Sequence, residues 1–349
     1  MKKTRVAING FGRIGRTFFR MAAGHPDFDI VAVNDLGDIE NLAYLLTYDT
    51  AYGRSPHDIK VTGGKLVVNG SEIEFLSERE PSNLPWEKLG VDIVIESTGF
   101  FTSYEASKAH LKAGAKRVVI SAPVKDDPEA AGVTGATVLM GVNDSVLGED
   151  CQISSNASCT TNATSPLVAI LKKSIGIEKA VLNTVHAYTA TQALIDAPSK
   201  KDFRKGRSAA QNIIPSSTGA AVATTKAHTD LAGNFDGIAM RVPVSVGSIV
   251  DLTFIASKDT TVEEVNAALR AAAATPAWSP LFAVTEEPIV SSDIIGAQFA
   301  AIADLSFTRV VGGNLVKVLA WYDNETSYTS TLVQHVASIA KFFQRQEKN

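Results

Sequence analysis

Short apolar runs alternate with helical patterns through the first third of the chain. Four of the runs are rich in valine and isoleucine and are bounded by turn-forming residues, which predicts strands at residues 5–9, 29–34, 92–96 and 117–121. Helical patterns lie between several of these strands, over residues 13–24, 39–46 and 104–113. This alternation predicts a parallel sheet with helices on both faces. The turn signals Gly63-Gly64 and Asn69-Gly70 predict a pair of hairpins over residues 61–75 instead.

The pattern changes at about Ser158. A helix over residues 160–175 precedes four further predicted strands, at residues 180–186, 235–242, 249–255 and 315–322. Residues 189–217 between them are rich in turn signals, and a loop of this length inside a compact domain is usually functional. The chain ends in an amphipathic helix whose apolar residues recur at every third or fourth position: Tyr328, Leu332, Val336, Ile339 and Phe343.

Length and composition narrow the class of protein. A chain of 349 residues is long for one hydrophobic core, so we expect two domains. The content of 45% hydrophobic and 20% charged residues is typical of a globular protein, and a net charge of −4 provides no general attraction to nucleic acid or anionic lipid. The two cysteines, Cys151 and Cys159, argue against a disulfide framework and suit a reducing compartment.

No metal-ligand spacing, signal peptide or membrane-spanning stretch is found in the sequence. The apolar run near the start is too short for a signal peptide. We therefore expect a cytoplasmic protein without a bound metal.

A glycine-rich turn joins the first predicted strand to the first predicted helix. Gly10-Phe11-Gly12-Arg13-Ile14-Gly15 has the G-x-G-x-x-G spacing that lets a backbone approach a pyrophosphate closely. The next strand ends at Asp35, twenty residues beyond Gly15, where a carboxylate can accept hydrogen bonds from ribose hydroxyls. A plain turn with an unrelated aspartate is the alternative. Since Asp35 would repel a 2′-phosphate and no basic residue follows at 36–38, we predict NAD rather than NADP.

Cys159 stands at the start of the helix predicted after Ser158. The positive end of a helix dipole favours a thiolate, and so favours nucleophilic chemistry. Thr160, Thr161 and Asn162 add hydroxyl and amide groups suited to an oxyanion or a phosphate. The alternative is a buried, inert cysteine behind ordinary capping residues.

With these two signals, the chain resembles the phosphorylating glyceraldehyde-3-phosphate dehydrogenase family from end to end. The motifs that carry the resemblance stand in the family's order, at residues 9–15 (NGFGRIG), 96–99 (ESTG), 121–123 (SAP), 156–162 (NASCTTN), 186–189 (HAYT), 213–221 (IIPSSTGAA), 241–243 (RVP) and 321–326 (WYDNET).

The resemblance implies an α/β fold class with two domains. The first is an NAD-binding, Rossmann-type doubly wound parallel sheet over residues 1–157, completed by the C-terminal helix at 325–349. The second is an α+β catalytic domain with a mostly antiparallel sheet over residues 158–324.

The resemblance also implies a reaction, the oxidative phosphorylation of D-glyceraldehyde 3-phosphate to 1,3-bisphosphoglycerate with NAD and inorganic phosphate, in glycolysis or gluconeogenesis. Cys159 resembles the nucleophile that forms a thiohemiacetal and then a thioester, and His186 resembles its base. The cofactor NAD, the two substrates and a homotetramer follow from the family.

Further site residues follow from the same motifs. Thr189 and Arg241 would bind the substrate phosphate, and Ser158, Thr160, Thr218 and Gly219 the attacking phosphate. The expected cofactor residues, from the glycine loop to the nicotinamide carboxamide, are Gly10, Gly12, Arg13, Ile14, Asp35, Arg79, Ser121 and Asn324. Residues 197–207 resemble a loop that packs near a neighbouring subunit, and the sequence leaves open whether Arg204 or Lys205 contacts phosphate.

The chain departs from the family pattern at several places. Ala163 replaces a second cysteine, and residues 244–248 read VSVGS where TPNVS is usual. Since that segment borders the expected substrate-phosphate site, erythrose 4-phosphate remains an alternative substrate. A non-enzymatic role in binding RNA or a partner protein is the alternative from another class. The intact set Cys159, His186 and Arg241 argues against loss of catalysis, and the acidic net charge argues against RNA.

Overall fold

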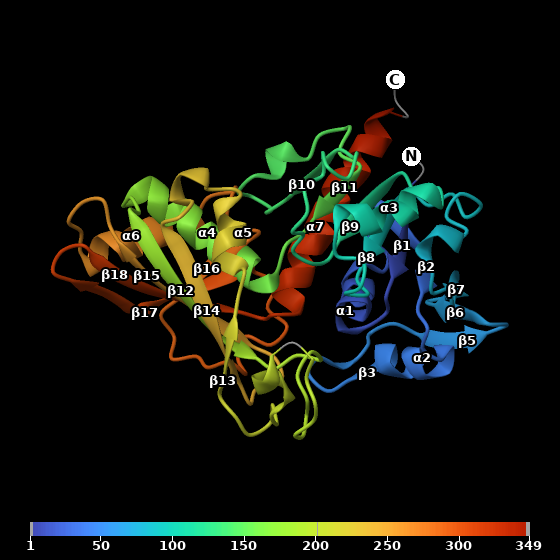
Figure 1. Ribbon diagram of the computed structural model, residues 1–349, viewed down its shortest axis with the longest axis horizontal. Coiled ribbons are helices and arrows are strands. Elements are labelled where there is room, and N and C mark those ends of the chain that lie inside the picture. The colour runs from blue at the N-terminus through green and yellow to red at the C-terminus, as the bar shows by residue number, and fades with distance from the viewer. Residues whose placement is uncertain (1–2, 201, 347–349) are drawn as a thin grey trace. The chain divides into compact units, whose positions relative to one another are not determined.

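The computed structural model of the protein describes residues 3–200 and 202–346 (Figure 1). Contacts divide the chain into two compact units. The first contains the chain up to Ala157 together with the segment from Thr329 onward, and the second runs from Ser158 to Tyr328. No helix among the described residues is long and apolar enough to cross a membrane.

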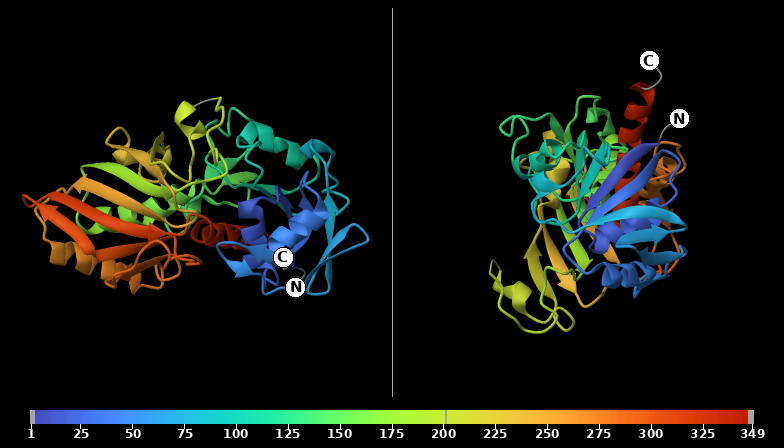
Figure 2. Two further views of the ribbon diagram at one scale, coloured as in Figure 1. Left: turned by 90° about the horizontal axis from the view of Figure 1, so that it is seen from below. Right: turned by 90° about the vertical axis from the view of Figure 1, so that its right-hand side faces the viewer.

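A nine-stranded sheet forms the first unit, in the order β10-β11-β9-β8-β1-β2-β7-β6-β5. The strands are β1 (Thr4–Asn9), β2 (Phe28–Asn34), β5 (Ile59–Thr62), β6 (Lys65–Val68), β7 (Ser71–Leu76), β8 (Ile93–Glu96), β9 (Arg117–Ile120), β10 (Gly135–Thr137) and β11 (Ile153–Ser155). All pairs from β10 to β7 are parallel, whereas β5, β6 and β7 pair antiparallel, as the two predicted hairpins require (Figures 1 and 2).

The chain winds outward from β1 in both directions, toward β8 on one side and β2 on the other. This is the doubly wound topology predicted from the sequence, and its ligands bind outside the carboxyl ends of the central strands. The helices of the unit are α1 (Arg13–Ala22), α2 (Ile39–Thr47), α3 (Tyr104–Lys112) and the part of α7 (Thr326–Gln346) from Thr329 onward. The short β10 and β11 were not predicted.

Side-chain caps begin two of these helices. The side chain of Asp38 accepts from the Asn41 N–H at α2, and that of Ser103 accepts from the Ala106 N–H at α3. In contrast, α1 follows Gly12 without a side-chain cap. The first N–H groups of a helix have no acceptor within it, so this end is chemically suited to an anion.

The second unit is built on a seven-stranded sheet in the order β13-β14-β12-β15-β18-β17-β16. Its strands are β12 (Lys179–Ala187), β13 (Ile214–Ser217), β14 (Phe235–Val242), β15 (Ser248–Ile255), β16 (Phe282–Thr285), β17 (Ala301–Val311) and β18 (Leu315–Tyr322). The pairs β12–β14 and β16–β17 are parallel and the other four are antiparallel, so the sheet is mostly antiparallel as expected.

Helices α4 (Cys159–Ser174), α5 (Ala220–Thr225) and α6 (Val262–Ala273) pack against this sheet. Alternate residues of β15 are buried, and Val250, Leu252 and Phe254 join Leu167 and Leu171 of α4 in one core. The sequence predicted α4 one residue late and did not predict α5, α6, β16 or β17. It also treated β13 as the end of a loop. The remaining short elements are β3 (Tyr48–Asp49), β4 (Gly53–Arg54) and four 3₁₀ turns at Pro81–Asn83, Asp144–Val146, Phe203–Gly206 and Thr229–Leu231.

Close packing at the start of α1 leads to a test of stability. A Cβ added at Gly15 would lie 2.1 Å from the Gly10 carbonyl oxygen, whereas one added at Gly12 would meet no atom within 4 Å. We expect Gly15→Ala to lower the free energy of unfolding by roughly 1–3 kcal/mol, because the backbone has to shift. Gly12→Ala, the matched control, should unfold near the wild-type urea midpoint. Equal midpoints for the two variants would contradict this packing.

Candidate active site

Cys159 is the first residue of α4, one position earlier than the predicted helix start. Ser158 is the N-cap, and its hydroxyl accepts from the Thr161 N–H at 3.1 Å. Ala157 just before it has φ = +56°, in the left-handed region that side chains other than glycine rarely adopt. The chain therefore makes a sharp, capped turn immediately before the thiol.

The thiol of Cys159 faces the imidazole of His186. Sγ lies 3.3 Å from Nε2, although 27 residues separate the two in the sequence. His186 is the second-last residue of β12, which lies beside β14 in parallel register so that His186 stands opposite Arg241. The structure thus brings together the predicted nucleophile, the predicted base and an arginine expected at the substrate phosphate.

The second ring nitrogen of His186, Nδ1, contacts the backbone and Arg241. Nδ1 lies 2.7 Å from the Ala187 carbonyl oxygen and 2.6 Å from Nη1 of Arg241, which also donates to that oxygen at 3.0 Å. If Nδ1 carries the proton and donates to Ala187, Nε2 accepts from the thiol, as a general base requires. If Nδ1 accepts from Arg241, the Nε2–H donates to the sulfur and stabilises a thiolate. Both tautomers suit a nucleophilic cysteine.

Burial dominates the electrostatics of this pair. It lowers the pKa of His186 to about 3, and the nearby charge of Arg241 acts in the same direction. Burial raises the pKa of Cys159, while Arg241 and hydrogen bonds from Thr160 oppose that rise. Burial therefore opposes the thiolate that the helix start favours.

Two residues that the sequence analysis missed support the pair. The Tyr322 hydroxyl lies 2.8 Å from the hydroxyl of Thr160 and 2.8 Å from that of Thr184. The Tyr322 ring stands edge-on to the His186 ring, with centroids 5.9 Å apart. Thr184 and His186 are two residues apart on one strand and so share a face, which was a signal available in the sequence.

The hydroxyl groups expected to bind phosphate form hydrogen bonds with other groups of the protein. The Ser158 hydroxyl caps α4, and the Thr160 hydroxyl faces Tyr322 rather than an open site. Thr189 and Thr218 form hydrogen bonds with near neighbours in sequence, to Thr191 at 2.9 Å and to the Ala220 N–H at 3.2 Å.

Gly219 precedes α5 as its N-cap. Arg204 is exposed and pairs with Asp202 at 3.1 Å. Of the six predicted phosphate-binding residues, only Arg241 and Thr160 therefore join the contacts around Cys159 and His186.

Asn324 is held through the segment that departs from the family pattern. Its side-chain oxygen accepts from the Gly247 N–H at 3.0 Å and from the Ser248 hydroxyl at 3.2 Å. Gly247 has φ = +97°, and a Cβ there would lie 2.7 Å from the Ser291 carbonyl oxygen, so this position requires glycine. Because the side-chain oxygen is occupied by these donors, the amide nitrogen is the end of Asn324 that is oriented to serve a ligand.

A cavity of about 410 Å³ lies in the first unit at the carboxyl ends of the central strands. Of the predicted cofactor residues, Gly10, Gly12, Asp35 and Arg79 line it. The sequence analysis missed its other lining residues, Asn9, Asn34, Leu36, Glu78, Ser97, Thr98, Phe100 and Phe101.

The glycine loop fits a pyrophosphate. A Cβ at Gly10 would lie 2.6 Å from the Thr98 nitrogen, whereas Gly12 has open space above its Cα. Asp35 is held in place by the Phe11 N–H at 2.7 Å and the Gly37 N–H at 2.8 Å.

Four of the predicted cofactor residues do not line this cavity: Asn324 of the second unit, and Arg13, Ile14 and Ser121 of the first. The Arg13 guanidinium pairs with Asp49 at 2.5 Å and lies over the Tyr52 ring. Ile14 follows it within α1, and the Ser121 N–H donates to the backbone of Glu96. Among the described residues, no group of three or more His, Cys, Asp or Glu side chains could hold a metal ion.

The position of Arg241 provides a test of the electrostatics. Removing its charge with Arg241→Gln should raise the pKa of Cys159, because Arg241 opposes the effect of burial. Alkylation by iodoacetamide, followed over pH, should then shift to higher pH. Arg207→Gln removes an exposed arginine of the same unit and is the control. An unchanged pH profile in Arg241→Gln would contradict the assigned role of this charge.

Comparison with known proteins agrees with this arrangement. Residues 4–104 match the family described as glyceraldehyde 3-phosphate dehydrogenase, NAD binding domain, and residues 158–324 match its C-terminal domain. The chain is 48% identical to glyceraldehyde-3-phosphate dehydrogenase of Geobacillus stearothermophilus over 96% of this chain and 98% of the relative. It is 46% identical to that of Clostridium acetobutylicum over 97% of this chain and 98% of the relative. With both domains matched at this identity, the chain belongs to the glyceraldehyde 3-phosphate dehydrogenase family.

Proposed function

We propose that this protein is the NAD-dependent enzyme that converts D-glyceraldehyde 3-phosphate and inorganic phosphate to 1,3-bisphosphoglycerate, in glycolysis or gluconeogenesis. The observation that carries the proposal is the 3.3 Å contact between the Cys159 thiol and the His186 imidazole, with Arg241 beside it. A nucleophile and a base within hydrogen-bond reach, oriented by a third group, are the arrangement that covalent catalysis requires.

The residues of the second unit supply the covalent steps. Sγ of Cys159 adds to the aldehyde carbon while its proton passes to Nε2 of His186 and from there to the former carbonyl oxygen, which gives a tetrahedral thiohemiacetal. Bound NAD would supply the acceptor for the hydride that leaves that carbon. His186 removes the hydroxyl proton of the thiohemiacetal as the thioester forms. An oxygen of inorganic phosphate then attacks the thioester carbonyl and the C–S bond breaks. His186 returns its proton to the sulfur, so the thiol of Cys159 is restored as the acyl phosphate leaves.

Several residue roles belong to this proposal. Arg241 and Thr189 bind the substrate phosphate, and Ser158, Thr160, Thr218 and Gly219 bind the attacking phosphate. Because the Thr160 hydroxyl is bonded to Tyr322, its backbone N–H at the start of α4 is the better donor.

In the first unit, Gly10, Gly12 and the N–H groups of Arg13 and Ile14 hold the pyrophosphate of NAD, and Asp35 holds the ribose. Arg79 lies near the adenine, Ser121 near the nicotinamide ribose, and Asn324 binds the carboxamide. We assign residues 1–157 with 325–349 to the NAD-binding domain and 158–324 to the catalytic domain.

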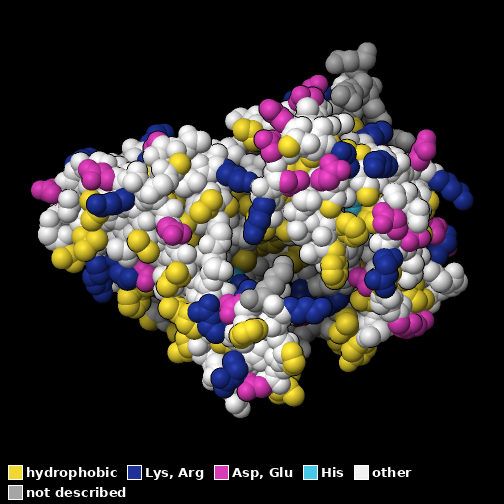
Figure 3. Space-filling model, in the orientation of Figure 1, with side chains coloured by type: hydrophobic (Ala, Val, Ile, Leu, Met, Phe, Trp, Pro, Cys, Tyr) yellow, Lys and Arg dark blue, Asp and Glu magenta, His cyan; other side chains and the backbone are white. Residues whose placement is uncertain are grey.

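We also propose a cytoplasmic homotetramer. The segment at residues 189–217 exposes large apolar side chains, among them Ile195 (75% exposed), Phe203 (84%) and Ile213 (71%). Apolar groups gathered on one protruding segment are typical of a surface that a second subunit covers. On the face shown in Figure 3, acidic and basic side chains are interspersed, which is unlike the single-sign surface of a nucleic-acid-binding protein.

Initial-rate kinetics with paired cofactors and substrates test the function. We expect turnover of glyceraldehyde 3-phosphate that requires inorganic phosphate and is slower with erythrose 4-phosphate. With NADP in place of NAD, kcat/KM should fall roughly a hundredfold or more, because Asp35 repels a 2′-phosphate. A preference for NADP, or turnover without phosphate, would contradict the proposal.

Substitution of the reacting pair gives a second test. We expect Cys159→Ser to abolish turnover while NAD binding persists, because a serine hydroxyl is a much weaker nucleophile at neutral pH. His186→Asn should lower kcat by roughly 10²–10⁴-fold, as expected for a lost general base. Cys151→Ser is the matched control, since Cys151 is buried in the first unit and should leave kcat unchanged. Substantial turnover by Cys159→Ser would contradict the assignment of Cys159 as the nucleophile.

A further inference from the structure

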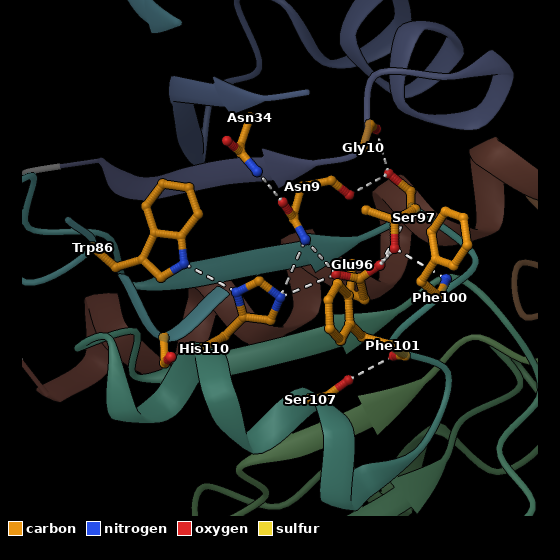
Figure 4. Close-up of polar contacts among 12 residues, drawn as sticks. Asn9, Gly10, Asn34, Trp86, Glu96, Ser97, Phe100, Phe101, Ser107 and His110 are labelled. Carbon is orange, nitrogen blue, oxygen red and sulfur yellow. Dashed lines mark hydrogen bonds and ion pairs between the residues drawn. The ribbon is translucent and has the colours of Figure 1, made fainter. Parts of the chain in front are cut away.

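A chain of buried polar side chains lies beside the cavity of the first unit and includes residues to which the reaction assigns no role (Figure 4). It runs from Trp86 through His110, Glu96 and Asn9 to Asn34, and each of the five is at most 4% exposed. Trp86 and His110 do not line the cavity, whereas Asn9 and Asn34 do. The chain therefore connects the protein interior to the wall of the proposed NAD site.

The directions of these hydrogen bonds follow from a group that can only donate, the Trp86 indole, and from one that only accepts, the Glu96 carboxylate. The Trp86 indole N–H can only donate, and it lies 3.0 Å from Nδ1 of His110. Nδ1 therefore carries no proton, so Nε2 carries it and donates to Glu96 at 3.0 Å. The Asn9 amide nitrogen donates to the same carboxylate oxygen at 2.6 Å, and its oxygen accepts from Asn34 at 2.7 Å.

Glu96 is the centre of this network. Its second carboxylate oxygen accepts from the Thr98 N–H at 2.8 Å and from the Thr98 hydroxyl. All four of these neighbouring groups donate to Glu96, which suits a carboxylate, because a carboxylate only accepts. An amide in its place would direct its NH₂ group at one pair of these donors, whichever way it turned.

Through Glu96, three walls of the cavity are linked. The first is the glycine loop, held by Asn9 and by the Ser97 hydroxyl, which donates to the Gly10 carbonyl oxygen at 2.7 Å. The second is the loop that begins at Thr98. The third is the segment at Glu78, whose backbone exchanges two hydrogen bonds with the Asn34 side chain, at 2.8 and 2.9 Å.

We propose that Glu96, oriented by His110 and Trp86, is a positioning residue for the NAD site. It sets the relative places of the three walls and so preorganises the cavity for the adenosine and pyrophosphate of NAD. This inference rests on the proposed function, since it concerns the same cofactor. It adds a role for residues that neither touch NAD nor take part in the steps at Cys159.

The second unit contains a matched control for Glu96. Asp304 is also a buried carboxylate, 1% exposed against 2% for Glu96. One of its oxygens accepts from the N–H and hydroxyl of Ser306, two residues further on, and the other accepts from the Trp321 indole at 3.1 Å. At both positions, an amide in place of the carboxylate would thus turn an NH₂ group toward a hydrogen-bond donor. Asp304 differs from Glu96 in having no link to the cavity of the first unit, which it does not line.

The test compares Glu96→Gln with Asp304→Asn in the full-length protein. The dissociation constant of NAD is measured by calorimetry, the thermal midpoint by scanning fluorimetry, and the reactivity of Cys159 by its alkylation rate. We expect both variants to lose thermal stability, but only Glu96→Gln to bind NAD roughly ten- to a hundredfold more weakly. Alkylation of Cys159 should stay at the wild-type rate in Glu96→Gln, since the network lies in the first unit and Cys159 in the second.

Trp86→Phe provides a second, milder variant should Glu96→Gln not fold. It removes the donor to Nδ1 together with part of a buried ring, and it leaves every residue that lines the cavity in place. We therefore expect NAD to bind roughly two- to fivefold more weakly. Equal NAD affinity in wild type, Glu96→Gln and Trp86→Phe would overturn the inference, as would an equal loss of affinity in Asp304→Asn. Failure of the wild-type protein to bind NAD would overturn the proposed function, and this inference with it.

Discussion

The 3.3 Å contact between the Cys159 sulfur and the His186 imidazole nitrogen constrains where the helix and the strand that carry them must lie in the second unit. Cys159 has to open a helix, and His186 has to stand near the end of a strand. The parallel register of β12 and β14 then places Arg241 beside His186, so one strand pairing supplies both the base and the charge that acts on it. Because His186 is buried and Cys159 partly buried, this single positive charge affects them more than it would in water.

Burial also explains why both candidate sites are surrounded by complete hydrogen-bond networks. Around the reacting pair, Tyr322 is bonded to Thr160 and Thr184. In the first unit, Glu96 is surrounded by donors from Asn9, His110 and Thr98. A polar group without a partner is costly in a low-dielectric interior, whereas a complete network is rigid. Each site therefore has little freedom to rearrange, which suits a reaction that depends on accurate placement.

The parallel strands of the first unit followed from the sequence because buried strands are marked by continuous valine and isoleucine. The same signal failed for β17, which carries Asp304, Ser306 and Thr308 and contains an irregularity in its pairing with β18. It also failed for β10 and β11, which have three residues each. The helix α6 was missed although its capping box, Thr261 with Glu264, is a local signal that the sequence contains.

The sequence by itself determined the chemistry that is available: a glycine loop before a helix, an acidic residue after the next strand, and a cysteine at a helix start. Those features are local, so short stretches of chain are enough to reveal them. Only the tertiary structure decided which groups meet, since the decisive contacts join residues 27, 55 and 87 positions apart. It also decided how far the site is removed from water, and this burial raises the pKa of Cys159 against the local effect of the helix start.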